Sequence, residues 1–357
     1  MPPAPQHRIL TLDPAIPNTD RLKIRDNFSA IVLAGRHLWL GGDEGTSVER
    51  MTVDSFGNFG QHQRTDLGRF IHLVADDQGA IREIDIEGLD LNGGYLWVAG
   101  SHSLKRKKAD PEKSADTNRK RLLEIDAERN RHTLARVPVD ATGSLAKTVG
   151  GLTAARLTVD ANGDQLTAAI RADKHLGNAC TVPSKENGLD IEGLAVIGNR
   201  VFIGLRGPVL RGWAVIVEFQ WKDSGDGLIS IDGEIKKHFL QVGGLGIREL
   251  AIHGKDLYIL AGPTMELDGP VFLYRWPKAL DNSVEAMIWQ SNNVLEKVLA
   301  VPFGDGESAG RDHAEGIALI SKPGGGLEVM ICYDSPASTR LIPEHPEQVL
   351  VDIFQLA

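Results

Sequence analysis

Apolar and polar residues alternate along five stretches of the chain, and each stretch is followed by a glycine-containing turn and a second apolar strand. The pattern is clearest in "IEGLDLNGGYLWVAGS", which begins at residue 86, and in "IEGLAVIGNRVFIGLR", which begins at residue 191. Alternation with a period of two predicts half-buried β-strands, and Asn-Gly or Gly-Asn pairs between strands predict tight hairpins. The other stretches begin at residues 28, 247 and 314. The chain therefore contains five copies of one predicted hairpin.

Each predicted hairpin carries a polar residue near the start of its first strand and a large apolar residue in its second strand. The two positions are ten residues apart in four hairpins, as in Glu87 and Trp97, whereas a longer turn in the fifth brings Met330 to the second position. We call the polar position the anchor; the anchors are Ser29, Glu87, Glu192, Arg248 and Glu315. Such a repeat at regular spacing is typical of a repeat architecture.

Further strands follow the hairpins, for example "WAVIVEFQW" at 213–221. Four short antiparallel strands per repeat are typical of a propeller blade. The sequence therefore predicts an all-β fold, a β-propeller that forms a single domain over residues 1–357. Successive anchors are 58, 105, 56 and 67 residues apart, and the gap of 105 contains the helix-like stretch "DQLTAAIRADKHLGNAC". We expect five blades with a partly helical insertion around 141–186, and six blades are the alternative.

Several segments lie outside the repeats. "HRILTLD" at 7–13 and "VLVDIFQL" at 349–356 predict strands that close the ring, and residues 1–6 predict a disordered leader. The segment 101–121 is rich in Lys and Arg and predicts a charged loop. Two roles stay open for this loop: a solvated connection, or a mobile basic flap over an anionic ligand.

Composition narrows the class of protein. The chain has 39 glycines and 6% aromatic residues among its 357 residues, which fits many tight turns. A net charge of −9 argues against a nucleic-acid partner, and no apolar run is long enough to predict a membrane-spanning helix. Two cysteines without a CxxC pair, and a start that lacks the pattern of a signal peptide, predict a cytoplasmic protein of bacterial type.

The anchors predict a common site. The first strand of each propeller blade lines the central channel, and antiparallel pairing places the end of the second strand beside the start of the first. The anchors should therefore surround one channel mouth, where their carboxylates repel one another unless something compensates. Three explanations stay open: an arginine ring, an architectural use of hydrogen bonds from turn N–H groups, or a divalent metal, Ca²⁺ first, held by Glu87, Glu192 and Glu315.

Basic residues near the same mouth predict an anionic ligand. The loop "RGPVLRGW" begins at Arg206 and contains Arg211, and two guanidinium groups offer forked donors for a carboxylate or phosphate. The candidate ligand-binding set is Lys185, Arg206, Arg211 and Arg248. The candidate acid–base residues are His102, His313 and Glu192, because a histidine titrates near neutral pH and a carboxylate can position water.

Two stretches carry a resemblance to known families. "SKENGLDIEGL" from 184 and "GLRGPVLRGW" from 204 resemble a bacterial family catalogued as a domain of unknown function, and the likeness extends over most of the chain from about residue 27. More distantly, the Asp-x-Glu-Gly strand start followed by a glycine turn and an aromatic strand is similar to β-propeller phytases and phytase-like esterases. That resemblance implies calcium ligands at Glu87, Glu192 and Glu315.

These observations predict two classes of function. The first is binding of a small anionic molecule at the channel mouth, with metal-assisted hydrolysis of an ester, phosphoester or lactone as the enzyme hypothesis. The alternative is a non-catalytic scaffold that binds another protein, which predicts a mouth plugged by side chains and an apolar patch elsewhere. Neither class calls for a nucleic acid or a membrane.

Overall fold

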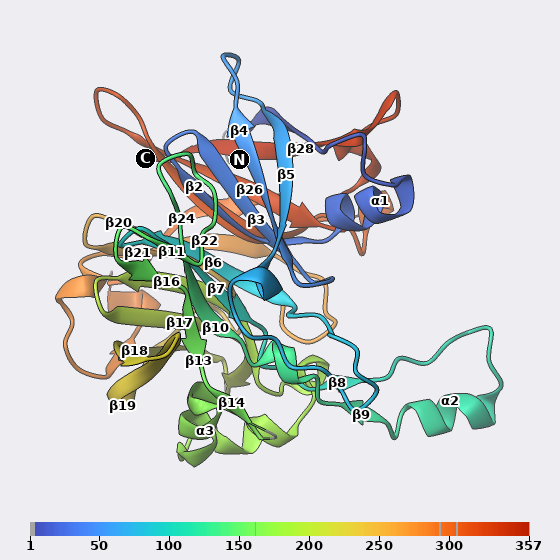
Figure 1. Ribbon diagram of the computed structural model, residues 1–357, viewed down its shortest axis with the longest axis vertical. Helices are drawn as coiled ribbons and strands as arrows, with labels where there is room; N and C mark the ends of the chain where they lie inside the picture. The colour runs from blue at the N-terminus through green and yellow to red at the C-terminus, as the bar shows by residue number, and fades with distance from the viewer. Residues whose placement is uncertain (1–3, 161, 293, 305, 357) are drawn as a thin grey trace.

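The computed structural model describes residues 4–356 except 161, 293 and 305, and these residues form mostly β-strands (Figure 1). Antiparallel pairing arranges the main strands in sets of four, and short parallel pairings join neighbouring sets at Leu10 with Phe59 and at Arg156 with Leu228. The first set contains β2 (Phe28–Ala34), β3 (His37–Gly42), β4 (Ser47–Val53) and β5 (Phe59–Asp66). The second contains β6 (Ile86–Asn92), β7 (Tyr95–Gly100), β10 (Leu134–Pro138) and β13 (Ala155–Leu157).

The three remaining sets follow the same order. The third contains β16 (Asp190–Ile197), β17 (Arg200–Leu210), β18 (Trp213–Gly225) and β19 (Leu228–Leu240). The fourth contains β20 (Gly246–His253), β21 (Asp256–Gly262), β22 (Val271–Trp276) and β24 (Glu296–Val301). The last contains β25 (His313–Ser321), β26 (Leu327–Asp334), β28 (His345–Leu356) and β1 (Gln6–Thr11).

The first strands of the sets surround a common axis. Strand β2 contacts β6, β6 contacts β16, β16 contacts β20, β20 contacts β25, and β25 contacts β2. The amino-terminal strand β1 pairs antiparallel with β28 near the carboxyl end and completes the last set. The predicted all-β propeller is therefore confirmed, and we interpret each set of four strands as one blade.

Shorter elements lie in the connections within and between the blades. The helices are α1 (Asn18–Asp26), α2 (Ala115–Arg121) and α3 (Gln165–Ala172). The minor strands among the described residues are β8 (Lys105–Arg106), β9 (Ile125–Asp126), β11 (Thr148–Val149), β12 (Leu152–Thr153), β14 (Val159–Asp160), β15 (Gly163–Asp164), β23 (Ala286–Ile288) and β27 (Leu341–Ile342). Helix α2 projects away from the strands (Figure 1).

The partly helical insertion lies where the long anchor gap predicted it, but it begins later than residue 141. Residues 155–157 form β13, which is the outer strand of the second blade, so the insertion is the segment between β13 and β16. Its helical part is α3 with two short 3-10 turns. Of the expected leader 1–6, residues 1–3 lie outside the described residues, and Gln6 already begins β1. No helix among the described residues has the length and apolar character needed to cross a membrane.

Buried apolar residues form a hydrophobic cluster between each pair of neighbouring blades. The large apolar residue in the second strand of each hairpin is at most 6% exposed, and each of the five clusters contains one of these residues. They are Trp39, Trp97, Phe202, Tyr258 and Met330. Burial of an aromatic side chain is among the largest stabilising contributions that one residue makes. The repeated residue spacing is therefore explained by packing between blades.

A glycine directly after the anchor permits close approach of neighbouring blades. A Cβ atom on Gly88 would lie 2.6 Å from Cβ of Leu194 in the next blade, and one on Gly316 would lie 3.0 Å from the backbone nitrogen of Ile31 in the first blade. These distances are too short for ordinary contacts. The Glu-Gly pair thus places a charged group at the channel and removes the side chain that would separate two blades.

We predict that Gly88→Ala lowers the free energy of unfolding by about 1–3 kcal/mol, because the added methyl group overpacks the interface with Leu194. Urea unfolding followed by tryptophan fluorescence measures the change. The control is Gly60→Ala in β5, where an added Cβ meets no atom within 4 Å. Equal stability of the two variants would contradict this account of the interface.

Candidate functional site

Each first strand begins with a β-bulge, and the anchor is the residue that the bulge inserts. In β6, Ile86 pairs with Gly100 and Gly88 pairs with Ala99, so the register passes over Glu87. The same shift passes over Ser29, Glu192, Arg248 and Glu315 in the other first strands. A bulge re-aims the side chain at the inserted position. The anchors therefore leave the alternation of the strand, which frees them to meet at the channel mouth.

Two arginines and three acids form what we call the arginine ring. Arg248 Nη1 lies 2.8 Å from Glu192 Oε2, and Arg248 Nη2 lies 3.0 Å from Glu315 Oε1. Arg206 Nη1 lies 2.6 Å from Glu192 Oε1 on the other side, and its Nη2 lies 2.5 Å from Asp190 Oδ2. All five side chains are buried. Glu192 is therefore held between two guanidinium groups, and the ring joins three blades.

Asp43, Asp85 and Glu87 form a second group, which we call the acid cluster. One carboxylate oxygen from each residue lies within 4.8 Å of the others. Asp43 follows β3 of the first blade, whereas Asp85 and Glu87 stand at the start of the second blade. Ser29 Oγ donates a hydrogen bond to Asp43 Oδ1. The group therefore spans two blades.

Burial and mutual repulsion change the acidity of this cluster. Burial, together with the charges of Asp85 and Asp334, raises the pKa of Asp43 to about 7. Burial and the charge of Asp43 raise the pKa of Glu87 well above its usual value. Strongly raised carboxylate pKa values are typical of sites that hold a proton or a cation for function.

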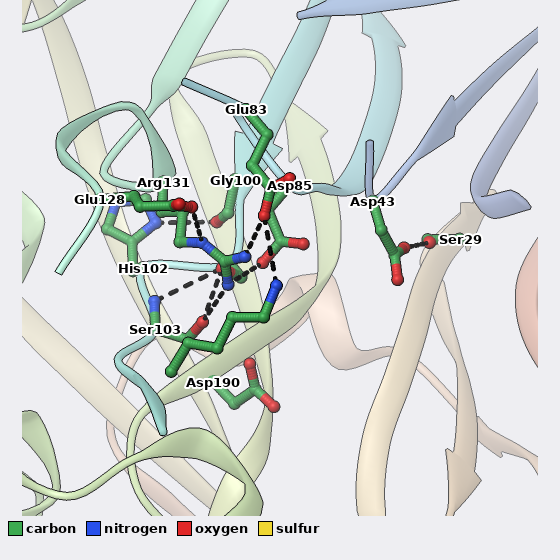
Figure 2. A network of polar contacts seen from close by, with 12 residues as sticks. Ser29, Asp43, Glu83, Asp85, Gly100, His102, Ser103, Glu128, Arg131 and Asp190 are labelled. Carbon is green, nitrogen blue, oxygen red and sulfur yellow. Dashed lines mark hydrogen bonds and ion pairs between the residues drawn. The ribbon is translucent and has the colours of Figure 1, made fainter. Parts of the chain in front are cut away.

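Arg131 compensates one member of the acid cluster (Figure 2). Its Nη1 lies 2.5 Å from Asp85 Oδ2, its Nε lies 2.9 Å from Glu128 Oε2, and it also contacts Glu83 and Ser103. Sequence reasoning missed Arg131, because it lies in a 3-10 turn outside every repeat. Arg131 compensates the charge of Asp85. The remaining charge of the cluster is therefore that of Asp43 and Glu87.

A pocket of about 550 Å³ opens above the acid cluster. Acids from the first three blades line it together with Arg131 and Arg206; these acids are Asp43, Asp85, Glu87 and Asp190. Its other lining residues include a group of cations that we call the basic rim: Lys105, Arg106, Lys107, Lys108 and Lys185. The pocket thus combines an acidic group with nearby cations, which suits an anionic ligand bound beside a metal ion.

The charged loop 101–121 supplies most of the basic rim. Strand β8 within it pairs with β9. Arg106 Nη2 lies 3.1 Å from Glu186 Oε2, and Lys108 Nζ lies 3.0 Å from Glu266 Oε1. These ion pairs tie the loop to other parts of the pocket wall. The sequence left two roles open for the loop, a solvated connection or a basic flap over an anionic ligand. A loop held at the wall of the pocket lies where the flap would be.

The structure separates the predicted ligand-binding residues. Lys185 and Arg206 line the pocket, and Arg248 lies in the arginine ring. Arg211 is exposed in the hairpin turn between β17 and β18, with a positive φ of 51°. It is absent from the described residues that line the pocket. We therefore assign Arg211 no contact with a ligand in this pocket.

The predicted metal ligands do not form one group. Arg206 and Arg248 engage both oxygens of Glu192, and Arg248 engages Glu315. Glu87 belongs instead to the acid cluster with Asp43 and Asp85. The arginine ring therefore explains Glu192 and Glu315, and the metal hypothesis moves to a different set of acids, of which Glu87 is the one shared member.

The structure corrects the expected position of His102. Its side chain has no exposed surface, Nδ1 lies 2.8 Å from the carbonyl oxygen of Gly100, and Nε2 lies 2.9 Å from Asp164 Oδ2. Both ring nitrogens are therefore engaged inside the protein, and His102 is not at the pocket wall. The backbone of His102 has a positive φ of 53°. The sequence did not predict this conformation.

His313 does not line the pocket above the acid cluster. It begins β25, its Nε2 lies 3.2 Å from Asp268 Oδ1, and its Nδ1 lies 3.5 Å from Asp334 Oδ2. The hydrogen bond with Asp334 raises the pKa of His313. The imidazole is therefore more readily protonated than an ordinary histidine, which suits a proton donor better than a base.

Comparison with protein families identifies the chain. It belongs to the family described as "Protein of unknown function (DUF3616)", whose model matches residues 27–352. No curated protein shows significant similarity to the chain. The family resemblance inferred from the two motif-bearing stretches is thus confirmed.

Several solved structures are distantly similar. A putative 6-phosphogluconolactonase from Bacteroides uniformis has 13% identity and a TM-score of 0.33 over 92% of this chain and 69% of that chain. An α-L-arabinofuranosidase from Clostridium thermocellum has 11% identity and a TM-score of 0.44, over 92% and 89%. The periplasmic gluconolactonase of Pseudomonas aeruginosa has 14% identity and a TM-score of 0.34, over 92% and 88%. Scores this low carry no argument about activity.

The raised pKa of Asp43 predicts a pH dependence of stability. Between about pH 4 and pH 7 the folded protein keeps a proton on Asp43 that the unfolded chain releases, so this contribution to stability is lost as the pH rises through about 7. We expect Asp43→Asn to be more stable than the wild type by about 1–3 kcal/mol at pH 8, and the difference to shrink towards pH 4.

Urea unfolding in the presence of a chelator measures this difference across the pH range. The matched control is Asp77→Asn, because Asp77 is an exposed aspartate. A wild-type stability that falls no faster with pH than that of Asp43→Asn would show that Asp43 titrates normally.

Proposed function

Because the family description assigns no activity, we propose from the site alone that the channel mouth binds a small anionic molecule beside a divalent metal ion and hydrolyses an ester, phosphoester or lactone. The observation that carries this proposal is the acid cluster at the pocket: carboxylates from two blades share one space, and Arg131 pairs with Asp85. A divalent cation would compensate the remaining charge.

The donor set fits a hard cation. Asp43, Asp85 and Glu87 offer carboxylate oxygens, which are the ligands that Ca²⁺ and Mg²⁺ prefer. Ca²⁺ is the first candidate, since it accepts irregular sets of oxygen ligands. A bound divalent ion supplies polarisation of a carbonyl or phosphoryl oxygen and lowers the pKa of water.

The basic rim supplies recognition of the anion. Lys185 lines the pocket together with Lys105 and Lys107. Lys105 lies 3.6 Å from Glu83 and Lys107 lies 2.5 Å from Glu124, so Lys185 is the lysine of this group that we assign to the anion. Arg206 lines the same pocket while Asp190 and Glu192 fix its guanidinium. Preorganised cations of this kind hold a carboxylate or phosphate without a large cost in side-chain entropy.

Hydrolysis also needs a group that accepts a proton from the attacking water. Asp43 is a ligand in the proposed ion site, so its pKa of about 7 describes the metal-free pocket. A bound ion would instead ease the loss of the water proton by lowering the pKa of water. Glu192 is poorly suited to this role because two arginines engage its oxygens. We therefore assign Glu192 to positioning of Arg206 and Arg248, Asp43 to binding of the ion, and His313 to a secondary proton donor.

A second candidate function is the non-catalytic scaffold. Exposed apolar side chains lie along one segment after the fourth blade's third strand: Val284 is 64% exposed, Met287 is 51% exposed and Trp289 is 43% exposed. Trp289 packs edge-on against Trp213 with ring centroids 4.6 Å apart. An exposed patch that includes aromatic residues favours a protein partner on that face.

The metal part of the proposal predicts that the wild type binds Ca²⁺ and that Glu87→Gln weakens this binding at least about tenfold, because one anionic ligand is lost. Isothermal titration measures the affinity. The matched control is Glu44→Gln, whose side chain pairs with Lys23 and is half exposed. Failure of the wild type to bind Ca²⁺, Mg²⁺ or Mn²⁺ would remove the metal from the site.

The ligand part predicts that Lys185→Ala lowers kcat/KM for p-nitrophenyl phosphate about tenfold, or about 1.4 kcal/mol, and leaves the neutral ester p-nitrophenyl acetate unchanged. The reason is that Lys185 contributes charge at the pocket, which a neutral substrate does not use. Lys236→Ala is the control, since Lys236 binds the carbonyl oxygen of Ser283 away from the pocket. Absence of turnover of either compound and of a lactone panel, with and without Ca²⁺, would favour the scaffold.

A further inference from the structure

A second group of metal-type ligands lies where the insertion packs on the second blade. His102 follows β7, His132 follows the 3-10 turn Arg129–Arg131, and Asp164 ends β15 in the insertion. One ligand atom from each residue lies within 4.8 Å of the others. The group is distinct from the acid cluster, and two imidazoles with one carboxylate are a ligand set typical of zinc.

The hydrogen bonds of His102 require a proton or a metal ion at its Nε2. The carbonyl oxygen of Gly100 only accepts, so the proton of a neutral His102 ring stands on Nδ1, 2.8 Å away. His102 Nε2 then presents a lone pair to Asp164 Oδ2 at 2.9 Å, and an ionised carboxylate also only accepts. Two acceptors at this distance require either a second proton on the imidazole or a metal ion.

The second histidine favours the metal. Thr167 Oγ1 donates to Asp164 Oδ1 at 3.0 Å, so it accepts from His132 Nδ1 at 2.9 Å. The lone pair of His132 therefore stands on Nε2, for which the described residues supply no hydrogen-bond donor. An ion pair between His102 and Asp164 leaves this lone pair to solvent, whereas a metal ion bound to Asp164 would use it. His132 retains 9% exposure, which gives an ion access from the surface.

The surrounding contacts resemble those that support metal ligands. The Gly100 carbonyl fixes the orientation of His102, and Thr167 fixes both His132 and Asp164 through its hydroxyl group. The backbone N–H of Thr167 also donates to Asp164 Oδ1 at 2.8 Å, which leaves Oδ2 directed at His102. Such outer contacts select the nitrogen that binds and orient the ligand.

We infer that His102, His132 and Asp164 bind one divalent transition-metal ion, with Zn²⁺ the best fit, as a structural centre that fastens the insertion to the second blade. Three protein ligands leave one tetrahedral position for a water molecule. The inference stands apart from the proposed function, because it uses none of the residues of the pocket.

The test uses the full chain with Zn²⁺ and Co²⁺ as probes. We expect about one Zn²⁺ per chain by elemental analysis, and after removal by a chelator we expect Co²⁺ to give the visible absorption of a tetrahedral site. His132→Ala should abolish stoichiometric binding, and Thr167→Val should weaken it about 10–100-fold, because it removes an orienting hydroxyl group. His175→Ala is the control, since His175 is an exposed histidine of the same insertion.

Wild-type protein that holds no zinc and gives no tetrahedral Co²⁺ spectrum would overturn the inference, and so would a spectrum that His132→Ala leaves unchanged. A nitrogen NMR signal showing protons on both ring nitrogens of His102 in the presence of Zn²⁺ would also overturn it. If His132→Ala fails to fold, Thr167→Val together with the wild-type Co²⁺ spectrum decides the question. Asp43→Asn combined with Glu87→Gln should leave Zn²⁺ binding unchanged, which separates this centre from the acid cluster.

Discussion

The β-bulge at the start of each first strand is the constraint on which the channel mouth depends. In a regular strand, successive side chains point to opposite faces of the blade, where neighbouring blades bury them. The inserted residue leaves this alternation, so a charged side chain can stand at the channel while Trp97 and its equivalents stay in the apolar clusters. The glycine after Glu87 then lets the next blade approach. One backbone irregularity thus serves both packing and polar chemistry.

Charge balance divides the mouth into two parts. In the arginine ring, Arg206 and Arg248 compensate buried acids at hydrogen-bonding distance, and removing one partner of such a group is strongly destabilising. In the acid cluster, Asp85 is the one acid for which the described residues supply an arginine partner. Burial raises carboxylate pKa values in both groups, those of Asp43 and Glu87 in the cluster and that of Glu315 in the ring, so the ion pairs make the difference. The ring therefore acts as a fixed support, whereas the cluster remains able to take up a cation. A chain keeps such uncompensated acids at a cost in stability, which is the usual sign of a functional site.

The repeated part of this arrangement could be predicted from sequence, and the unrepeated part could not. Apolar alternation and the ten-residue spacing from Glu87 to Trp97 predicted the first hairpins, because packing between blades imposes the same demand each time. Convergence of Glu192, Arg248 and Glu315 followed from the expected symmetry, and the structure brings them together. The ion pairs between acids and arginines depend on side-chain rotamers and on the paths of the loops. The repeat pattern predicts neither.

Arg131 and His102 show this limit. Arg131 comes from a 3-10 turn, and only the folded chain brings it to Asp85. His102 follows the strand end that should face the mouth, but its backbone turns the ring towards Asp164 of the insertion.

The central claim is that the acid cluster, and not the arginine ring, takes a divalent cation at the channel mouth. Anomalous diffraction from crystals soaked in Mn²⁺ tests it most directly. The account predicts a peak within bonding distance of Asp43, Asp85 and Glu87, with the ion pairs of Glu192 unchanged. A peak at Glu192 and Glu315, or a channel mouth without any peak at saturating Mn²⁺, would contradict it.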